Sequence, residues 1–357
     1  MKTTESQSLP IFRKALIPMG FNSNKKKGHT KGHVLAGDVG GTKTNLAIFE
    51  MKKGQLFLKR EKSYKTKDHN SLFEIIKNFQ DEEMPIIDSM CLGVAGPVTK
   101  GKVHGTNFPW DIDTEELIKE FRLESVFLIN DMQANAYGLA MLQEEDFDRL
   151  KYGSKIAGNA VIISPGTGLG EAGLYWDGEV YHPFATEGGH CDFSPRNDFD
   201  LEIWQYFQQK YGHVSWERIL SGQGIRDMYQ LIRNVSGEME TDAFKTKMKM
   251  EDPAAVITKT ALEGSDAVCR ETLDLFVRFL AIETAQLALK FKATGGIYIG
   301  GGILPKIIKG MNREVFNNNF MQSGRMNSLL QMVPISVILN ENTALLGAGY
   351  YGAMSQK

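Results

Sequence analysis

The sequence predicts an α/β protein built from two similar halves, each with a mixed β-sheet flanked by helices. Each half opens with a short apolar strand, a Gly/Thr-rich turn and a returning strand, with the turns at residues 40–42 and 166–168. A continuous apolar run at 126–129 is typical of a strand buried on both faces. Later strands alternate with segments of helical apolar spacing, as in α/β folds.

Periodicity and turn residues place the individual elements. Expected strands are 33–38, 44–49, 55–64, 84–94, 126–129, 160–164, 297–299 and 334–339, and a hairpin joins 171–176 to 179–182 across Asp177-Gly178. Expected helices are 71–80, 132–142, 265–292 and 343–351. The repeated opening is a weak duplication of architecture, and two such halves are expected to face each other across a cleft.

Composition excludes several classes of protein. The 357 residues are 42% hydrophobic, enough for a sizeable core, and the formal net charge of −2 gives no basic field for nucleic acid. The three cysteines, Cys91, Cys191 and Cys269, form no disulfide framework and no zinc spacing. No apolar run approaches the roughly 20 residues that span a bilayer. A cytoplasmic protein without nucleic-acid or membrane partners is expected.

Residues 1–32 differ from the remainder of the chain. They carry seven Lys or Arg residues against one acid, Glu5, and so form a basic N-terminal extension. Such a segment is either a solvated extension, partly docked on the core, or a basic interaction arm.

Two nucleotide-binding motifs are nearly matched, and both are rejected. Residues 37–44 approach the Walker A pattern, but Thr42 replaces the second glycine, and a strand is expected where that motif opens a helix. Residues 168–173 fit G-x-G-x-x-G, yet they lead into the expected hairpin rather than a helix.

The two Gly/Thr turns are candidates for binding phosphate. Backbone N–H groups of glycine-rich turns cradle phosphate oxygens, and one turn in each half could clamp a polyphosphate from both sides. Asp38 lies beside the first turn, where a carboxylate can hold Mg²⁺ directly or through water. The alternative is ordinary hairpin chemistry, with Asp38 bonding its own turn.

Asn130-Asp131 directly follows the buried strand. A carboxylate at the carboxyl end of such a strand faces the ligand crevice of an open α/β sheet. Asp131 could therefore accept a hydroxyl proton during phosphoryl transfer. The alternative role for Asp131 is a helix N-cap.

Glu187-Gly188-Gly189-His190 places a carboxylate and an imidazole in a glycine-rich stretch. Sugars need several hydrogen-bond partners, and Glu, His and Asn side chains together supply donors and acceptors. The alternatives are a loop glutamate and a metal-binding histidine, although beyond the adjoining Cys191 nothing completes a zinc site.

Several motifs in one order carry a family resemblance. They are Gly37-Asp38-Val39-Gly40-Gly41-Thr42, Asn130-Asp131, Gly166-Thr167-Gly168-Leu169-Gly170, Glu187-Gly188-Gly189-His190, His213-Val214-Ser215-Trp216-Glu217-Arg218, Leu220-Ser221-Gly222 and Gly300-Gly301-Gly302. Over residues 33 to 352 the chain resembles the bacterial glucokinase family of the hexokinase/actin superfamily. The resemblance implies an actin-like (ribonuclease H-like) two-domain sugar kinase fold with a cleft between the domains.

The resemblance also implies an activity, the ATP-dependent phosphorylation of glucose on its 6-hydroxyl, the first step of glycolysis. Asp131 would be the general base, and ATP with Mg²⁺ the cofactors. The implied sugar-binding residues are Asn130, Asp131, Glu187, His190 and Glu217; the implied ATP-binding residues are Gly37, Asp38 (near Mg²⁺), Val39, Gly40, Gly41, Thr42, Gly166, Thr167, Gly168, Gly300, Gly301 and Gly302.

By the same resemblance, residues 33–141 plus 340–357 would form a small domain and residues 142–339 a large one. The family often has Asn or Ser at the position of Lys43, so this side chain either reaches phosphate or is solvated. The cysteine-rich zinc motif of the related repressor and kinase family is absent after His190, and 32 residues are too few for a helix-turn-helix domain ahead of the match.

Three other functions stay open at this point: a kinase for another hexose or an N-acetylhexosamine, a non-catalytic sugar-sensing regulator, and an actin-like filament or chaperone protein. Asp131, Asp38 and both phosphate turns argue against the regulator, and Asn130-Asp131 with the Glu187/His190 pair, which have no purpose in a filament or chaperone protein, argue against the third function. A homodimer also stays open.

Overall fold

The computed structural model describes residues 8–9, 16–21, 31–52, 55–80, 85–105, 108, 110–154 and 156–355. The chain divides into two compact units, the first made of 1–144, 174–185 and 340–357, and the second of 145–173 and 186–339. The domain limits given by the resemblance stay a prediction.

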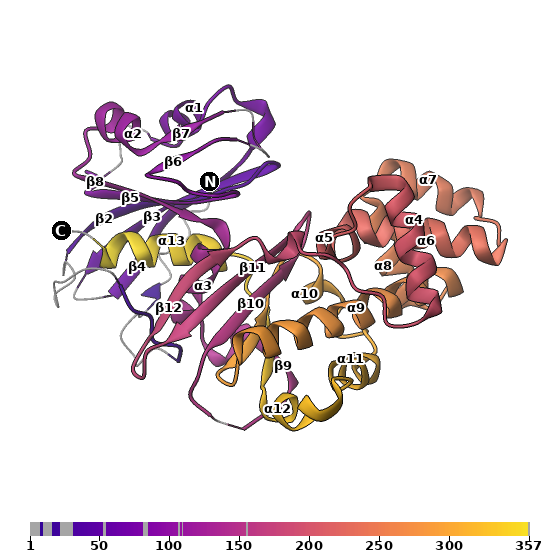
Figure 1. Ribbon diagram of the computed structural model, residues 1–357. Helices are drawn as coiled ribbons and strands as arrows, with labels where there is room; N and C mark the ends of the chain where they lie inside the picture. The colour runs from indigo at the N-terminus through magenta and orange to yellow at the C-terminus, as the bar shows by residue number, and fades with distance from the viewer. Residues whose placement is uncertain are drawn as a thin grey trace. The chain divides into compact units, whose positions relative to one another are not determined.

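The first unit is built on a sheet with the strand order β1-β4-β3-β2-β5-β8 (Figure 1). Its strands are β1 (Ser8–Leu9), β2 (Lys31–Val39), β3 (Lys43–Lys52), β4 (Gln55–Lys65), β5 (Ser89–Val94) and β8 (Ser125–Asn130). β2, β5 and β8 run parallel, whereas β2, β3 and β4 form an antiparallel meander. A separate short ribbon pairs β6 (Lys102–Val103) with β7 (Ile112–Asp113).

Helices cover this sheet. They are α1 (Leu72–Phe79), α2 (Thr114–Phe121), α3 (Asp131–Gly138) and α13 (Thr343–Met354), with 3-10 turns η1 (Thr66–Asp68) and η2 (Leu139–Met141). The last helix, α13, packs on β2, β3, β5 and α3. Gly138 and Gly347 permit the close crossing of α3 and α13, because a Cβ at either position would enter the backbone of the other helix.

The described part of the N-terminal extension is docked on the first unit. Gly20 donates its N–H to the carbonyl of Tyr181 at 2.8 Å, and the neighbouring Met19 is 6% exposed. The ring of Phe21 stacks on Tyr137 of α3 with centroids 5.4 Å apart, and it meets Tyr350 of α13 edge-on at 5.2 Å. The other residues of the predicted extension, apart from 8–9 and 31–32, lie outside the described part of the chain.

This docking predicts the effect of Phe21→Ala. Losing a partly buried ring and its aromatic contacts should cost about 2 kcal/mol and lower the apparent melting temperature by roughly 5 °C. The matched control is Leu16→Ala, because Leu16 is 49% exposed and should melt with the wild type. Equal melting temperatures for Phe21→Ala and wild type, measured by thermal denaturation, would contradict a stabilising role for the segment.

The second unit carries most of a sheet with the order β12-β11-β10-β13-β14-β9. Its strands are β9 (Phe147–Lys151), β10 (Ala160–Pro165), β11 (Leu169–Trp176), β12 (Tyr181–Thr186), β13 (Gly296–Ile299) and β14 (Ile335–Ile338). β10, β13 and β14 run parallel, and β9 is antiparallel to β14. Residues 174–185, the distal part of the β11–β12 hairpin, group with the first unit.

The helices of the second unit follow the hairpin. They are α4 (Asp198–Tyr211), α5 (Trp216–Ile219), α6 (Gly222–Ser236), α7 (Asp242–Met250), α8 (Pro253–Glu263), α9 (Ala267–Phe291), α10 (Leu304–Ile307), α11 (Arg313–Phe320) and α12 (Asn327–Met332), with 3-10 turns η3 (Glu144–Asp146), η4 (Gly188–His190) and η5 (Gly324–Met326).

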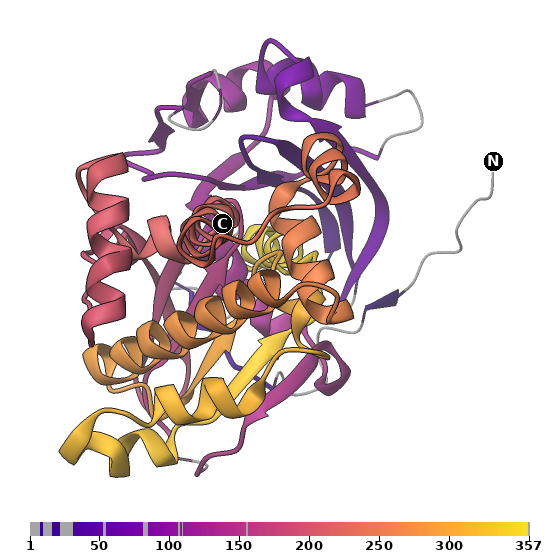
Figure 2. The same cartoon turned by 90° about the vertical axis from the view of Figure 1, so that its right-hand side faces the viewer.

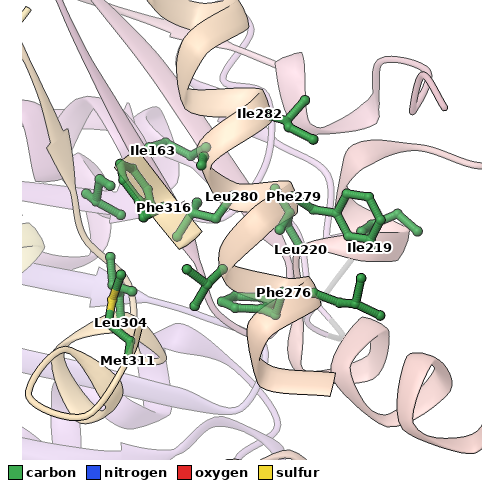
Figure 3. Close-up of a cluster of buried hydrophobic side chains, with 14 of the residues drawn as sticks. Ile163, Ile219, Leu220, Phe276, Phe279, Leu280, Ile282, Leu304, Met311 and Phe316 are labelled. Carbon is green, nitrogen blue, oxygen red and sulfur yellow. The ribbon is translucent and has the colours of Figure 1, made fainter. Parts of the chain in front are cut away.

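The long helix α9 is the centre of the second core. It packs against α6, α8, α11 and β10 and is buried around much of its circumference. Figure 2 shows this helix in orange, with α11 and α12 alongside it. Phe276, Phe279 and Leu280 project from α9 into a cluster that also holds Ile163 of β10 and Phe316 of α11 (Figure 3). A helix buried on most sides needs apolar residues around most of its circumference, and the sequence of α9 has them.

The structure confirms the predicted mixed sheets and the duplication of architecture. The order β4-β3-β2-β5-β8 in one sheet corresponds to β12-β11-β10-β13-β14 in the other. The predicted strand 84–94 begins only at Ser89, and residue 84 lies outside the described residues. Both rejected motifs are confirmed as rejected, because β3 and β11 are strands where those motifs need helices.

Candidate functional site

The predicted residues of the first unit gather at one edge of its sheet. Val39, Val94 and Asn130 are directly in register across the parallel strands β2, β5 and β8. The turn after β2, which includes Gly40, therefore emerges at the same edge of the sheet as the end of β8, with β5 between them. This agrees with the rule that ligands bind at the carboxyl ends of parallel strands.

Asp38 is held by a chain of side chains and does not bond its own turn. Asn45 of β3 donates from its amide to Asp38 Oδ2 at 3.2 Å, and Ser63 of β4 donates to Asn45 Oδ1 at 2.7 Å. Burial raises the pKa of Asp38, while the Asn45 hydrogen bond and the charge of Lys43 act in the opposite direction. A carboxylate kept from water in this way gains from a cation beside it.

The glycine turn after β2 is tied back by Thr66. The Thr66 hydroxyl donates to the carbonyl of Gly40 at 2.7 Å, and its backbone N–H donates to the carbonyl of Thr42 at 3.0 Å. The N–H of Gly40 closes the turn by donating to the carbonyl of Lys43. Thr66 thereby fixes the conformation of the predicted phosphate loop.

The N-cap of α3 is Asn130, so the alternative role proposed for Asp131 is wrong. Asn130 Oδ1 accepts from the N–H groups of Met132 and Gln133, and Asn130 Nδ2 donates to the carbonyl of Gly96. One hydrogen of this amide stays available for a ligand, because Nδ2 carries two. Asp131 occupies the first turn, where its Oδ1 accepts from the Met132 N–H at 2.8 Å.

The second unit contains a pocket of about 460 Å³. Gly166 and Thr167 of the second predicted phosphate loop line it together with Gly302, which the resemblance places beneath adenosine. Its other lining residues are Gly222, Gln223, Ile225, Arg226, Asp252, Pro253, Ala254, Ala255, Thr258, Ile303 and Lys306. The volume is that of a small-molecule site, and Arg226 and Lys306 bring positive charge to it.

The Gly300-Gly301-Gly302 segment needs glycine at its centre. Gly301 has φ +81°, and a Cβ there would enter the carbonyl of Pro165 at the end of β10. Gly300 donates its N–H to the carbonyl of Ile163 at 2.8 Å, which continues the pairing of β10 with β13. The two glycine segments of the second unit are therefore neighbours at the carboxyl ends of parallel strands.

Three predicted sugar-binding side chains lie together in the second unit. His190 Nε2 is 4.0 Å from Glu187 Oε2, and His190 Nδ1 is 4.0 Å from Glu217 Oε1. Glu187 and His190 are about three-fifths exposed and therefore accessible to a ligand. The imidazole lies between two carboxylates, which gives donors and acceptors within a few ångströms of each other.

The backbone of β11 fixes Glu217 in this group. Glu217 Oε2 accepts from the N–H of Leu169 at 3.0 Å. The same oxygen would lie 2.5 Å from a Cβ on Gly168, so the glycine lets the carboxylate approach the second phosphate loop. Strand β11 thus joins the predicted sugar-binding residues to the second predicted phosphate loop.

Cys191 links the loop at Gly188 to the helix that carries Glu217. Its N–H donates to the carbonyl of Gly188, and its carbonyl accepts from the N–H of Trp216. Cys191 is exposed, unlike the buried Cys91 and Cys269.

Among the described residues, no group of three or more His, Cys, Asp and Glu is placed to hold a metal ion. In the same part of the chain, no helix is long and apolar enough to cross a membrane.

Comparison with known proteins identifies the family. A sequence model of the family described as glucokinase matches residues 35–355. The chain belongs to the glucokinase family. A glucokinase from Nostoc punctiforme is 37% identical over 337 residues, covering 90% of this glucokinase-family chain and 98% of the relative.

Solved structures place the chain in the same fold. A glucokinase from an Antarctic psychrotroph is 29% identical, has a TM-score of 0.72 and covers 89% of this glucokinase-family chain and 98% of its own. A ROK family glucokinase from Streptomyces griseus, solved with glucose and AMPPNP, is similar in fold at 18% identity, with a TM-score of 0.58 and coverage of 90% and 99%. The predicted family and actin-like sugar kinase fold are confirmed.

Several residues of this glucokinase-family site could not be found from the sequence. Thr66, Asn45 and Ser63 support the predicted phosphate loop and Asp38 from positions on β3, β4 and η1. Arg226 and Lys306 line the pocket from α6 and α10, and neither residue belongs to a motif quoted from the sequence. In the sequence, only the glycine-rich turns and the motifs that contain acidic residues indicated the site.

The geometry of the glycine segment predicts the effect of Gly301→Ala. Forcing a Cβ into the left-handed region and toward the Pro165 carbonyl should cost about 2 kcal/mol and weaken ATP binding severalfold, because the neighbouring Gly302 lines the pocket. Thermal melting and ATP titration check both effects. Gly302→Ala is the control for stability, since a Cβ there has nothing within 4 Å. Equal stability of the two variants would contradict this account.

Proposed function

We propose that this protein transfers the γ-phosphoryl group of ATP to the 6-hydroxyl of glucose with Asp131 as the general base. Phosphorylation of glucose with ATP is the activity of the family to which the chain belongs. The observation that supports the residue assignment is the register of Val39, Val94 and Asn130, which brings Asp131 and the predicted phosphate loop to one edge of the sheet.

Asp131 is suited to accept the hydroxyl proton. Its carboxylate is oriented by the Met132 N–H in the first turn of α3, where the helix dipole favours negative charge. The 6-hydroxyl would approach this oriented carboxylate. General-base catalysis of this kind typically contributes 10² to 10⁴ in rate.

The sugar hydroxyls would be held by Asn130, Glu187, His190 and Glu217. The remaining amide hydrogen of Asn130 is a donor, the glutamates accept, and His190 can do either according to its tautomer. These residues make the site selective for a particular pattern of hydroxyl groups, because a missing partner leaves a polar group unpaired.

ATP would lie on the glycine segments. Residues 37–42 and 166–168 would bind its phosphates, and 300–302 would lie beneath the adenosine. The pocket lined by Gly166, Thr167 and Gly302 supports this assignment, as do the positive charges of Arg226 and Lys306 in its wall.

Asp38 would hold Mg²⁺, directly or through water. A single half-buried carboxylate fits a cation that keeps several waters and shares its remaining ligands with phosphate oxygens. When bound, Mg²⁺ neutralises charge on the phosphate groups. The Ser63–Asn45–Asp38 chain fixes the carboxylate for this role.

Sugar-dependent release of ADP tests the function. Purified protein with Mg-ATP is compared without sugar and with glucose, mannose, fructose or N-acetylglucosamine. Strong release with glucose alone supports the proposal, and a preference for another sugar would reassign the substrate. A cytoplasmic location fits the three free cysteines, and a homodimer stays a hypothesis.

Asp131→Asn should lower kcat at least 100-fold and leave glucose affinity within a few-fold of wild type, because the amide keeps the shape but cannot accept the proton. Turnover is measured by ADP release and glucose affinity by calorimetry. The control is Asp113→Asn, since Asp113 also stands at the start of a helix, α2, and accepts from the N–H of Glu115. Near-wild-type turnover of Asp131→Asn would exclude the general-base assignment.

Glu187→Gln should raise the KM for glucose about tenfold or more, because a carboxylate accepts a hydroxyl hydrogen bond better than an amide does. The KM for ATP should change little. An unchanged glucose KM in steady-state kinetics would show that Glu187 is a structural residue of the loop.

A further inference from the structure

Two buried glutamates of the second unit interact through their charges and are unused by the proposed mechanism, and one of them, Glu171, touches the predicted sugar-binding loop. Glu171 on β11 is 2% exposed, and Glu283 on α9 is 0% exposed. None of the described residues donates a hydrogen bond to Glu171 Oε1 or to either carboxylate oxygen of Glu283. Buried carboxyls without donors are unusual, since an ionised group there loses its hydration without replacement.

Glu171 touches the loop directly. A Cβ on Gly188 would enter Glu171 Oε2, so the carboxyl packs against the backbone between Glu187 and His190. The main chain is tied at the same place, because the Thr186 hydroxyl donates to the Glu171 carbonyl at 3.0 Å and accepts from the Gly188 N–H at 3.3 Å. Two residues before Glu171, the Leu169 N–H binds Glu217. Movement of Glu171 would therefore reach all three sugar-binding side chains of this unit.

The surrounding cations offset the negative charge of the pair only in part, although Lys290 forms an ion pair with Glu283 and its charge lowers the pKa of both glutamates. Lys290 Nζ is 3.6 Å from Glu283 Oε1, beyond hydrogen-bond distance, and its side chain is 48% exposed. Arg196 acts on Glu283 only weakly and is itself near the bidentate Asp200–Arg278 pair. Burial raises the pKa of Glu171 to about 7; burial and the charge of Glu171 raise that of Glu283 to about 8.

We propose that Glu171 is a positioning residue for glucose, whose carboxyl group supports the Glu187–His190 loop in its neutral form beside Glu283 and weakens glucose binding when it ionises. Two negative charges at these buried positions repel each other. Glu171 can reduce this repulsion by moving and displacing the backbone of Gly188, which it touches. This inference rests on the proposed function, because it assigns the loop to the sugar.

Linkage gives the direction of the pH effects. Since both pKa values are higher in the folded protein, the stability that the two groups contribute is complete below about pH 4.5 and is lost as pH rises through about 7 and 8. If binding requires neutral Glu171, the glucose KM should rise about tenfold one pH unit above its pKa. The kcat should change much less, because Glu171 contacts the loop that carries the predicted sugar-binding residues.

The test measures glucose KM and kcat from about pH 6 to about pH 9, a range that brackets both values. Wild type should show the alkaline rise in KM. Glu171→Gln keeps the size of the side chain and stays neutral, so its KM should be flat with pH. Glu283→Gln removes one of the two charges and should reduce the rise, which keeps the test valid if Glu171→Gln does not fold.

The matched control is Asp274→Asn. Asp274 is another acid of α9 with a buried oxygen lacking a hydrogen-bond donor among the described residues and with a pKa raised by burial, but it lies near Arg270 instead of the loop. It should keep the wild-type KM profile. A flat wild-type KM, an undiminished rise in both glutamine variants, or the same flattening in Asp274→Asn overturns the inference while glucose turnover persists. Absence of sugar-dependent turnover at every pH overturns the proposed function instead.

Discussion

Parallel pairing in register is the constraint on which the site depends. In a parallel sheet every strand ends at the same edge, so whatever follows the strands is brought together without further design. Here the segments after β2, β5 and β8 carry the glycine turn, Gly96 and Asn130-Asp131. The second sheet repeats this with β10 and β13, which end in the two glycine segments that share a pocket. A slip of one residue in either sheet would separate these groups.

The strand β11 has a different role, because it connects the predicted sugar-binding residues to the core of the second unit. Its first residue, Leu169, holds Glu217 through a backbone N–H, and its third, Glu171, touches the loop at Gly188 and interacts electrostatically with Glu283 of α9. One strand of the second unit therefore contacts both Glu217 and the loop that carries Glu187 and His190. Such a strand transmits small displacements, since a close-packed interior leaves little room to absorb them.

How much of this was visible in the sequence depends on the range of each interaction. Glycine turns, the strand at 126–129 and the long apolar helix are local patterns, and the structure has them where the sequence predicts them. The predicted burial of 126–129 on both faces is wrong, because Phe127 and Leu128 are only half-buried. The helix cap, which the sequence offers only as an alternative role for Asp131, belongs to Asn130; both residue types are good caps, and only the geometry of Met132 and Gln133 distinguishes them.

Other features are invisible locally because their partners are far apart in the chain. Glu171 and Glu283 are separated by more than a hundred residues, and each alone reads as an ordinary strand or helix acid. The same holds for Thr66, whose contact with Gly40 depends on the whole β3–β4 hairpin. Strand β9 was missed since its pairing to β14 requires residues near the other end of the chain.

The accessibility of the three thiols has a practical consequence. Burial raises the pKa of Cys91 far above its usual range and that of Cys269 to about 12, so neither presents a thiolate to a reagent near neutral pH. Cys191 is exposed and is hydrogen-bonded to both the Gly188 loop and the start of the helix that carries Glu217. Cys191 is therefore a single attachment point for a fluorophore that needs no engineered cysteine. A dye there would report the binding of a ligand to the neighbouring loop and to Glu217.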